Sequence, residues 1–134
     1  MLKGMWNYAV KVKNLDKAVD FYTKNLEAEL KMAGEVLGSR YRLIRMGNTR
    51  VLIFDKAPYE DALKLNLPEG FLHVVYEVDN VDTYVTRLKQ AGVNFFVEPR
   101  IISTDFGERK ITFFEAPGGI RTEVMQIRTE AGNT

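Results

Sequence analysis

The chain of 134 residues contains no cysteine and only one histidine, His73. Without cysteine it has no disulfide, no thiolate metal site and no cysteine nucleophile, which fits a reducing compartment. The formal net charge of +1 gives no basic surface for nucleic acid. No apolar run is long enough for a signal peptide or a membrane span. We therefore expect a cytoplasmic protein that binds neither nucleic acid nor membranes.

What is present is an ordinary globular composition, with 46% hydrophobic and 28% charged residues. A chain of this length can bury a hydrophobic core of its own. We therefore predict that residues 1–134 form a single domain.

The chain contains an internal repeat, which is the strongest signal in the sequence. Residues 7–22 (NYAVKVKNLDKAVDFY) align with residues 73–88 (HVVYEVDNVDTYVTRL). Four positions are identical in this alignment: Val12 and Val78, Asn14 and Asn80, Asp16 and Asp82, Val19 and Val85. In each copy an alternating strand pattern is followed by apolar residues at helical spacing. The repeat therefore predicts two similar strand–helix units.

The helix starts are marked by Asn14 and Asn80, whose side chains can accept from free N–H groups of a first helical turn. Asp16 and Asp82 follow in that turn, where the helix dipole favours negative charge. We expect helices at 15–26 and 81–91.

Further strands follow each helix. Residues 39–47 and 49–55 are joined at Gly47-Asn48, and residues 109–117 and 121–128 are joined around Pro117-Gly118-Gly119. This gives repeat one at 5–55 and repeat two at 71–128. The segment 56–70, bracketed by Pro58 and Pro68, is interpreted as a linker with a short helix, and 129–134 as a frayed tail.

Two such halves predict an α+β fold. Two βαβββ repeats would form one mixed, curved sheet around a cleft, with both helices on the convex side. Every second strand residue would face the cleft. Asn7 and His73 occupy equivalent positions, so we expect them to lie near each other on the cleft floor.

The chain resembles the vicinal oxygen chelate superfamily, which includes glyoxalase I, extradiol dioxygenases, methylmalonyl-CoA epimerase and bleomycin-resistance proteins. Four stretches carry the resemblance and cover most of the chain: VKNLDKAVDFYTKNL (12–26), HVVYEVDNVDTYVTRLKQAGV (73–93), FFVEP (95–99) and FFEAPGGIRTEV (113–124). Members share a fold more than a chemistry, so the resemblance does not supply a reaction.

The resemblance implies metal ligands at His73 and Glu123, with Glu123 also a candidate catalytic base. An imidazole and a carboxylate suit Mn, Fe, Ni or Zn. The first repeat departs from the pattern, because Asn7 is a weak third ligand and Leu52 cannot ligate. Any divalent metal would then be weakly bound or absent. The alternative is that Glu123 is a solvated strand residue and His73 an ordinary core or surface histidine.

Other side chains on or near the cleft strands are candidates for binding a substrate. Aromatic rings can stack on a planar ligand, and arginines can bind a carboxylate or phosphate. These candidates are Trp6, Tyr8, Arg42, Tyr76, Arg109, Phe114 and Arg121.

Two functions remain open at this point. The first is a metal-dependent lyase, isomerase or dioxygenase acting on a small substrate with adjacent oxygens. The second is a metal-free small-molecule binding protein, similar to bleomycin-resistance proteins. In both cases we expect a homodimer, because superfamily members of this size usually close the barrel with a second chain and because open sheet edges invite pairing.

Overall fold

The structure is a computed structural model and describes residues 1–132 and 134. Along the chain the elements are β1 (Leu2–Lys11), α1 (Leu15–Asn25), β2 (Glu29–Val36), β3 (Ser39–Met46), β4 (Thr49–Phe54), α2 (Glu60–Leu63), β5 (Gly70–Val78), α3 (Val81–Gln90), β6 (Phe95–Thr104), β7 (Gly107–Ala116) and β8 (Ile120–Ile127). Each half has the predicted order of strand, helix and three strands, although the sequence analysis had placed no strand at 29–36.

Both predicted helix starts are confirmed by their capping bonds. The side chain of Asn14 accepts from the Lys17 amide at 3.0 Å, and that of Asn80 accepts from the Thr83 amide at 3.1 Å. Helix α1 buries Leu15 and Val19, and α3 buries Val81 and Val85, each against its own half of the sheet. The helical spacing of these apolar residues is what attaches the two helices to the outer face.

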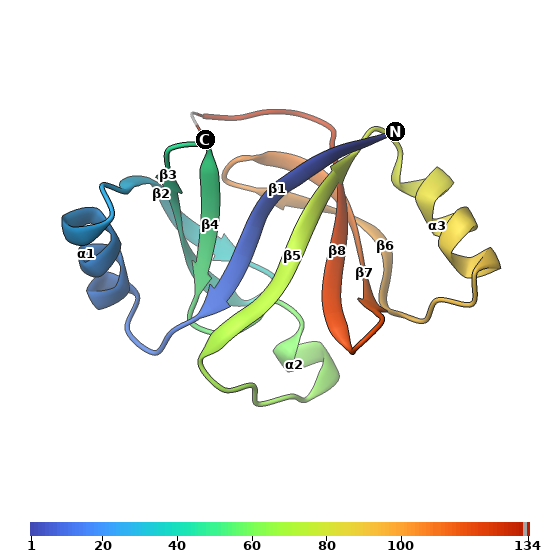
Figure 1. Cartoon of the computed structure of the whole chain (residues 1–134), viewed down its shortest axis with the longest axis horizontal. Coiled ribbons are helices and arrows are strands. Elements are labelled where there is room, and N and C mark those ends of the chain that lie inside the picture. Colours follow the sequence, from blue (N-terminus) through green and yellow to red (C-terminus); the bar gives the residue numbers. More distant parts are fainter. Residues whose placement is uncertain (133) are drawn as a thin grey trace.

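The eight strands form one mixed sheet in the order β2-β3-β4-β1-β5-β8-β7-β6. The first strands of the two halves, β1 and β5, pair antiparallel at its centre (Figure 1). Each of them pairs in parallel with the last strand of its own half, β4 or β8. The fold prediction of one mixed, curved sheet with helices outside is therefore confirmed.

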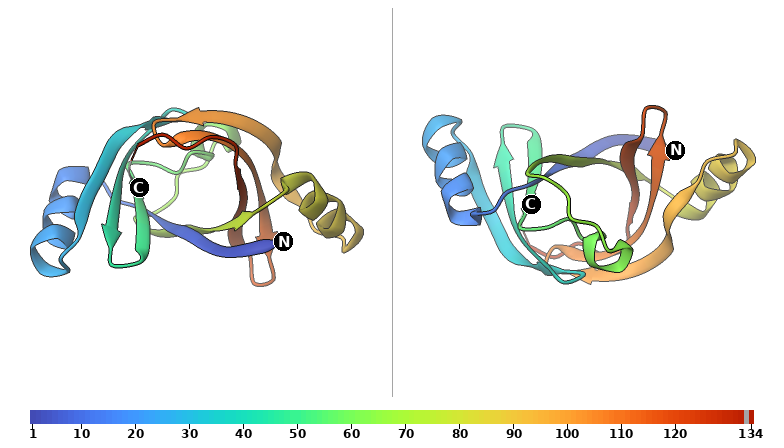
Figure 2. Two further views of the ribbon diagram at one scale, coloured as in Figure 1. Left: turned by 90° about the horizontal axis from the view of Figure 1, so that it is seen from above. Right: turned by 90° about the horizontal axis from the view of Figure 1, so that it is seen from below.

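The curvature brings the two edges of the sheet back toward each other. Strands β2 and β6 are in contact, so the sheet encloses an interior, as the views along the barrel show (Figure 2). The closure therefore occurs within one chain and does not need the second chain that the resemblance implied.

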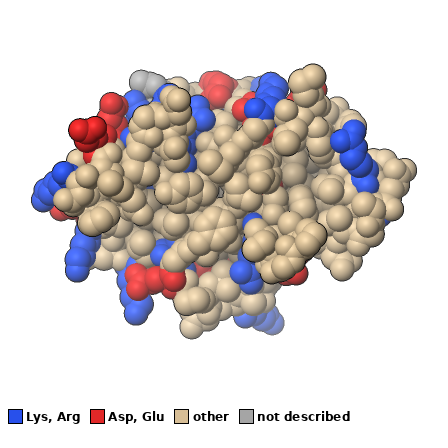
Figure 3. Space-filling model, viewed as in Figure 1, with Lys and Arg blue, Asp and Glu red and all other residues tan. Residues whose placement is uncertain are grey.

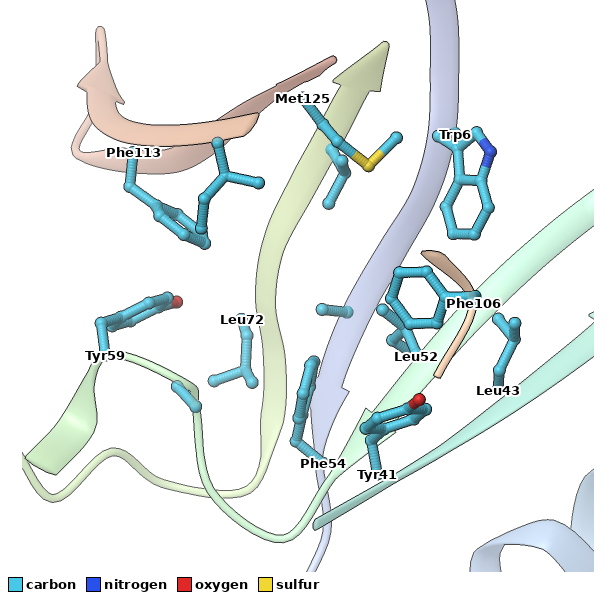
Figure 4. Packing of buried hydrophobic residues seen from close by; sticks show 14 residues of the cluster. Trp6, Tyr41, Leu43, Leu52, Phe54, Tyr59, Leu72, Phe106, Phe113 and Met125 are labelled. Atoms are coloured by element: carbon cyan, nitrogen blue, oxygen red, sulfur yellow. The ribbon is translucent and has the colours of Figure 1, made fainter. Parts of the chain in front are cut away.

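Large apolar side chains fill much of this interior (Figure 4). The cluster includes Trp6, Tyr41, Phe54, Phe106 and Phe113. Because these rings occupy the space inside the sheet, what remains of the expected cleft is small.

The segment between the halves is anchored to the sheet. Glu60 of α2 accepts from Lys11 Nζ at 2.8 Å and from the Leu67 amide at 2.9 Å. The carboxylate of Glu60 also accepts from the Ala57 amide. This ion pair and these hydrogen bonds fix the start of α2, and with it the neighbouring Tyr59, at one end of the barrel (Figure 1).

The C-terminal residues cover the other end. Arg109 Nη1 donates to the Thr129 carbonyl at 2.7 Å, and the Ala131 amide donates to the Phe106 carbonyl at 3.1 Å. These bonds hold Thr129 and Ala131 against the barrel, whereas the sequence predicted that residues 129–134 would fray. Asn133 lies outside the described residues. Within the described part of the chain, no helix combines the length and the apolar character needed to cross a membrane.

Candidate functional site

Three of the predicted site residues lie on neighbouring strands at the centre of the sheet. Asn7 of β1 is opposite Val75 of β5, and Val75 is opposite Glu123 of β8. His73 precedes Val75 by two residues and faces the same interior side. Its Nε2 lies 3.4 Å from Glu123 Oε1. The structure thus brings Asn7, His73 and Glu123 to one side of the sheet.

These three side chains are largely removed from solvent. Asn7 and His73 are 1% exposed and Glu123 is 9% exposed. The His73 ring packs edge-on against Phe113, with ring centres 5.0 Å apart. Glu123 is therefore not a solvated strand residue and His73 is not a surface histidine, whereas burial agrees with either a site histidine or an ordinary core histidine at position 73.

Tyr59 is a site residue that the sequence analysis missed. Its hydroxyl lies 3.0 Å from Nδ1 of His73, and its ring contacts those of Phe96 and Phe113. Burial raises the pKa of Tyr59 well above its ordinary value, Arg121 opposes the shift, and Glu123 and Glu60 add to it. The hydroxyl therefore keeps its proton at neutral pH.

A cavity of about 40 Å³ lies inside the barrel beside this group. Trp6, Leu52, Phe106 and Phe113 form apolar parts of its wall. Asn7, Thr104, Arg109 and Glu123 are its polar lining residues. The cavity thus offers a mostly apolar space with a carboxylate and a guanidinium in its wall.

A second and larger hollow adjoins the cavity. It measures about 330 Å³ and is lined by residues of α2 and β6, among them Tyr59, Phe96 and Arg100. The two spaces share Leu37, Pro58 and Phe113. These three shared residues therefore form the partition between the cavity and the hollow at the α2 end of the barrel.

Arg109 and Trp6 lie together at the end of the cavity that the C-terminal residues cover. Arg109 is 1% exposed, and its guanidinium lies 5.6 Å from the Trp6 ring centre and 5.0 Å from that of Phe106. Its Nε has no hydrogen-bond partner among the described residues. Of the predicted binding residues, Trp6 and Arg109 line the cavity. Arg121 lies at its α2 end, 6.0 Å from the ring centre of Tyr59.

The other predicted binding residues lie outside the cavity. Tyr8 packs beneath α1, Phe114 packs beneath α3, and Arg42 pairs with Asp16 of α1 at 3.5 Å. Tyr76 follows Val75, which lines the cavity, and so points to the opposite face. Side-chain alternation explains these corrections, because each of the three aromatic residues neighbours a residue that faces inward. On β7 the interior residue is Phe113.

Comparison with known proteins decides the family. Residues 7–124 match the model of the Glyoxalase/Bleomycin resistance protein/Dioxygenase superfamily. The chain belongs to this superfamily. It is 31% identical over 130 residues to the mitochondrial methylmalonyl-CoA epimerase of Bos taurus, covering 88% of this chain and 71% of that protein. It is 27% identical over 123 residues to the lactoylglutathione lyase of Neisseria meningitidis serogroup A, covering 90% and 88%.

Solved structures show the same superfamily fold. The methylmalonyl-CoA epimerase of Mycobacterium tuberculosis superposes with a TM-score of 0.77 at 19% identity, covering 96% of this chain and 90% of that one. A methylmalonyl-CoA epimerase in complex with methylmalonyl-CoA and NH4+ also superposes with a TM-score of 0.77, at 21% identity. This match covers 99% of this chain and 100% of that one. These similarities extend over nearly the whole chain, so both repeats take part in the shared fold.

The divalent-metal site expected at His73, Glu123 and Asn7 can be tested against the residues that the structure places there. The described residues contain no group of three His, Cys, Asp or Glu side chains that could hold an ion. Leu52 lines the cavity, and Asn7 Nδ2 donates to the Tyr8 carbonyl at 3.1 Å. One carboxylate would leave a divalent ion with uncompensated charge in apolar surroundings. The donor set does not fit a tightly bound metal.

Proposed function

We propose that this superfamily member binds a small organic molecule in the interior cavity and acts on it as an isomerase- or lyase-type enzyme. The observation that carries the proposal is the buried pair of Glu123 and His73, 3.4 Å apart beside the cavity. Membership of a superfamily with a lyase and an epimerase among the relatives supports the enzyme class, and is consistent with a metal-dependent lyase or isomerase.

The lining suggests what kind of molecule fits. The rings of Trp6, Phe106 and Phe113 suit an apolar body. Glu123 and His73 would meet its reacting polar end. A carboxylate or phosphate on the ligand could accept a hydrogen bond from Nε of Arg109, which has no partner among the described residues. Arg121 would lie near the α2 end of the cavity.

Glu123 is the carboxylate that the described residues place in the cavity wall, and is therefore our candidate general base. It would remove a proton from a carbon next to a carbonyl group, and the electron pair would move onto the carbonyl oxygen. His73 would donate a hydrogen bond to that oxygen. Returning the proton to the same carbon from the opposite side, or to the neighbouring atom, would give an isomer.

No step is assigned to a metal, because Asn7 and Leu52 stand at the first-repeat ligand positions. We propose that Mn, Fe, Ni or Zn binds weakly at His73, Glu123 and Asn7, or not at all. This favours a second candidate function, a metal-free protein that binds a metabolite or drug without transforming it. In that case Glu123 and His73 would serve as hydrogen-bond partners of the ligand.

Deuterium exchange separates the two candidates. The protein is incubated in D₂O with methylmalonyl-CoA and, separately, with lactoylglutathione, and loss of the carbon-bound proton is followed by NMR. The enzyme proposal predicts exchange that falls about 100-fold or more in Glu123→Gln. Glu115→Gln is the control, because Glu115 is an exposed carboxylate of the adjacent strand β7. Binding by calorimetry without exchange would favour the binding protein.

We also propose a homodimer formed through the outer face of β1 and β5. Figure 3 shows that charged side chains gather at the periphery of this face and that few lie over its centre. Leu2 and Met5 of β1 and Phe71 of β5 are exposed large apolar residues on these central strands. A second copy related by a twofold axis would cover the same patch on both chains. A stable interface of this kind buries roughly 1,600 Å² in total.

Light scattering coupled to size exclusion tests the dimer. Phe71→Glu should give a monomer at micromolar concentration, because it places a charge on the exposed apolar part of the proposed interface. Leu30→Glu is the matched control, since Leu30 is an exposed leucine on β2, away from this face. A monomeric unmutated protein would contradict the proposal.

The proposed partners are thus a small molecule and a second copy of the chain. The absence of cysteine and the net charge of +1 support a cytoplasmic location and give no reason to expect nucleic acid. Localisation of a fluorescent fusion would check the first of these expectations.

A further inference from the structure

We infer that Tyr59 is a positioning residue that donates to Nδ1 of His73 and so leaves the ring N–H on Nε2, facing Glu123. The inference rests on the proposed function only for the identity of the site, because it concerns the protein without its ligand. It assigns a role to a residue of the segment between the repeats, which has no counterpart in either repeat.

The hydroxyl of Tyr59 has one hydrogen-bond partner among the described residues, Nδ1 of His73 at 3.0 Å. Tyr59 is 2% exposed and His73 is 1% exposed, so water does not readily replace this partner. A buried hydroxyl proton without an acceptor costs about 1–3 kcal/mol. The hydroxyl therefore donates, and Nδ1 accepts.

A neutral imidazole carries one N–H group, and when Nδ1 accepts, that group is on Nε2. Nε2 lies 3.4 Å from Glu123 Oε1, longer than an ordinary hydrogen bond. Its hydrogen is thus only weakly engaged and is available to a ligand oxygen that lies along the N–H direction. The site then offers a donor at His73 beside an acceptor at Glu123, which is the pairing that a carbonyl compound with a neighbouring C–H or O–H group would use.

The same arrangement opposes metal coordination through Nε2. An ion needs the lone pair of that nitrogen, so the proton would have to move to Nδ1. Tyr59 would then accept from Nδ1–H, and its own proton would lose its partner. Tyr59 is therefore a third obstacle to a tightly held ion, together with Leu52 and Asn7.

The segment that carries Tyr59 is fixed well enough to determine which ring nitrogen of His73 carries the proton. Glu60 is held by Lys11 and by the Leu67 amide. The Tyr59 ring lies 5.3 Å from that of Phe96 and 5.1 Å from that of Phe113, measured between ring centres. The contacts of Glu60 and the packing of the Tyr59 ring against these two phenylalanines thus direct the hydroxyl at His73.

The lone histidine makes a direct test feasible. Protein labelled with ¹⁵N-histidine gives one pair of ring-nitrogen signals, and their shifts and couplings report which nitrogen carries the proton. We expect an unprotonated Nδ1 and a protonated Nε2 at neutral pH without ligand. A ring protonated at Nδ1, or at both nitrogens, would overturn the inference.

A variant isolates the role of Tyr59. Tyr59→Phe should shift the signals toward the other tautomer or toward a mixture, because the donor to Nδ1 is gone. Tyr41→Phe is the control, since Tyr41 is also buried and its hydroxyl donates to Asp105 at 2.9 Å instead. Unchanged signals in Tyr59→Phe would refute the positioning role. The unmutated spectrum alone decides the tautomer if the variant fails to fold, and it does so whether or not the protein turns over a substrate.

Discussion

The guanidinium of Arg50 lies over the indole ring of Trp6, 4.4 Å from its centre. Its Nη1 also lies 3.4 Å from the Trp6 carbonyl, a long contact for a hydrogen bond. Since Trp6 lines the cavity, this stacking fixes one part of the wall to β4. A cation over an indole in a partly buried position contributes about 1–2 kcal/mol.

We therefore expect Arg50→Met to lower the free energy of unfolding by about 1–2 kcal/mol. Chemical denaturation followed by circular dichroism measures this change. Arg100→Met serves as the control because Arg100 is exposed, and it should change stability by less than about 0.5 kcal/mol. An equal loss in both variants would show that the stacking on Trp6 contributes nothing.

Restoring ligands in the first repeat should create a metal site. Asn7→His adds an imidazole beside the pair of His73 and Glu123, and should tighten Ni or Zn binding at least about tenfold, which is about 1.4 kcal/mol. Leu52→Glu should help less by itself, because it places a charge among buried apolar residues. Calorimetric titration of both variants and of the unmodified chain provides the measurement. Strong binding by the unmodified chain would contradict our reading of its donor set.

The ion pair of Lys11 and Glu60 should make stability depend on pH. Burial tends to raise the pKa of Glu60, but hydrogen bonds from Lys11 and from the amides of Leu67 and Ala57 lower it below its ordinary value of 4.5. A carboxylate with a lowered pKa stabilises the fold above its ordinary pKa, and this contribution is lost as the pH falls through the folded value.

Glu60→Gln should therefore lower the free energy of unfolding by about 3 kcal/mol at pH 7. Below pH ~4 the difference in this free energy between the variant and the unmutated chain should be smaller. Thermal unfolding across this pH range tests the expectation. Asp61→Asn is the control, because Asp61 pairs with Lys56 on the surface. A pH-independent difference between Glu60→Gln and the unmutated chain would show that the loss comes from packing rather than from charge.

The contact of Gly107 with the C-terminal residues gives a fourth prediction. Gly107 has φ of +122°, and a Cβ there would collide with the Thr129 carbonyl. Gly107→Ala should displace residues 129–131 and expose the Arg109 end of the cavity. Amide exchange at Ala131, whose N–H donates to the Phe106 carbonyl, should accelerate about tenfold or more, if the bond contributes about 1.4 kcal/mol. Gly118→Ala, in the exposed β7–β8 turn, should leave this exchange rate unchanged.

The sequence predicted the parts of the fold that repeat with a regular period. Asn14 and Asn80 located both helix starts because a cap is a local interaction, and the alternation of β8 was enough to turn Glu123 inward. The same alternation argues against a place in the cavity for Tyr8 and Phe114, because each lies one position away from an inward-facing residue. Tyr59 was missed for another reason. The place where an aperiodic linker meets the barrel depends on long-range contacts such as that between Lys11 and Glu60, for which the sequence contains no local signal.

The two repeats of this protein share one order of elements, but Tyr59 enters from a segment between them that is not duplicated. A protein assembled from two identical halves would reproduce the sheet and would still lack the hydroxyl that meets His73. Opening the chain between Ala57 and Gly70 by circular permutation should likewise preserve the barrel while releasing Tyr59 from its place. The chemistry of the site therefore depends on the join between the duplicated units as much as on the units themselves.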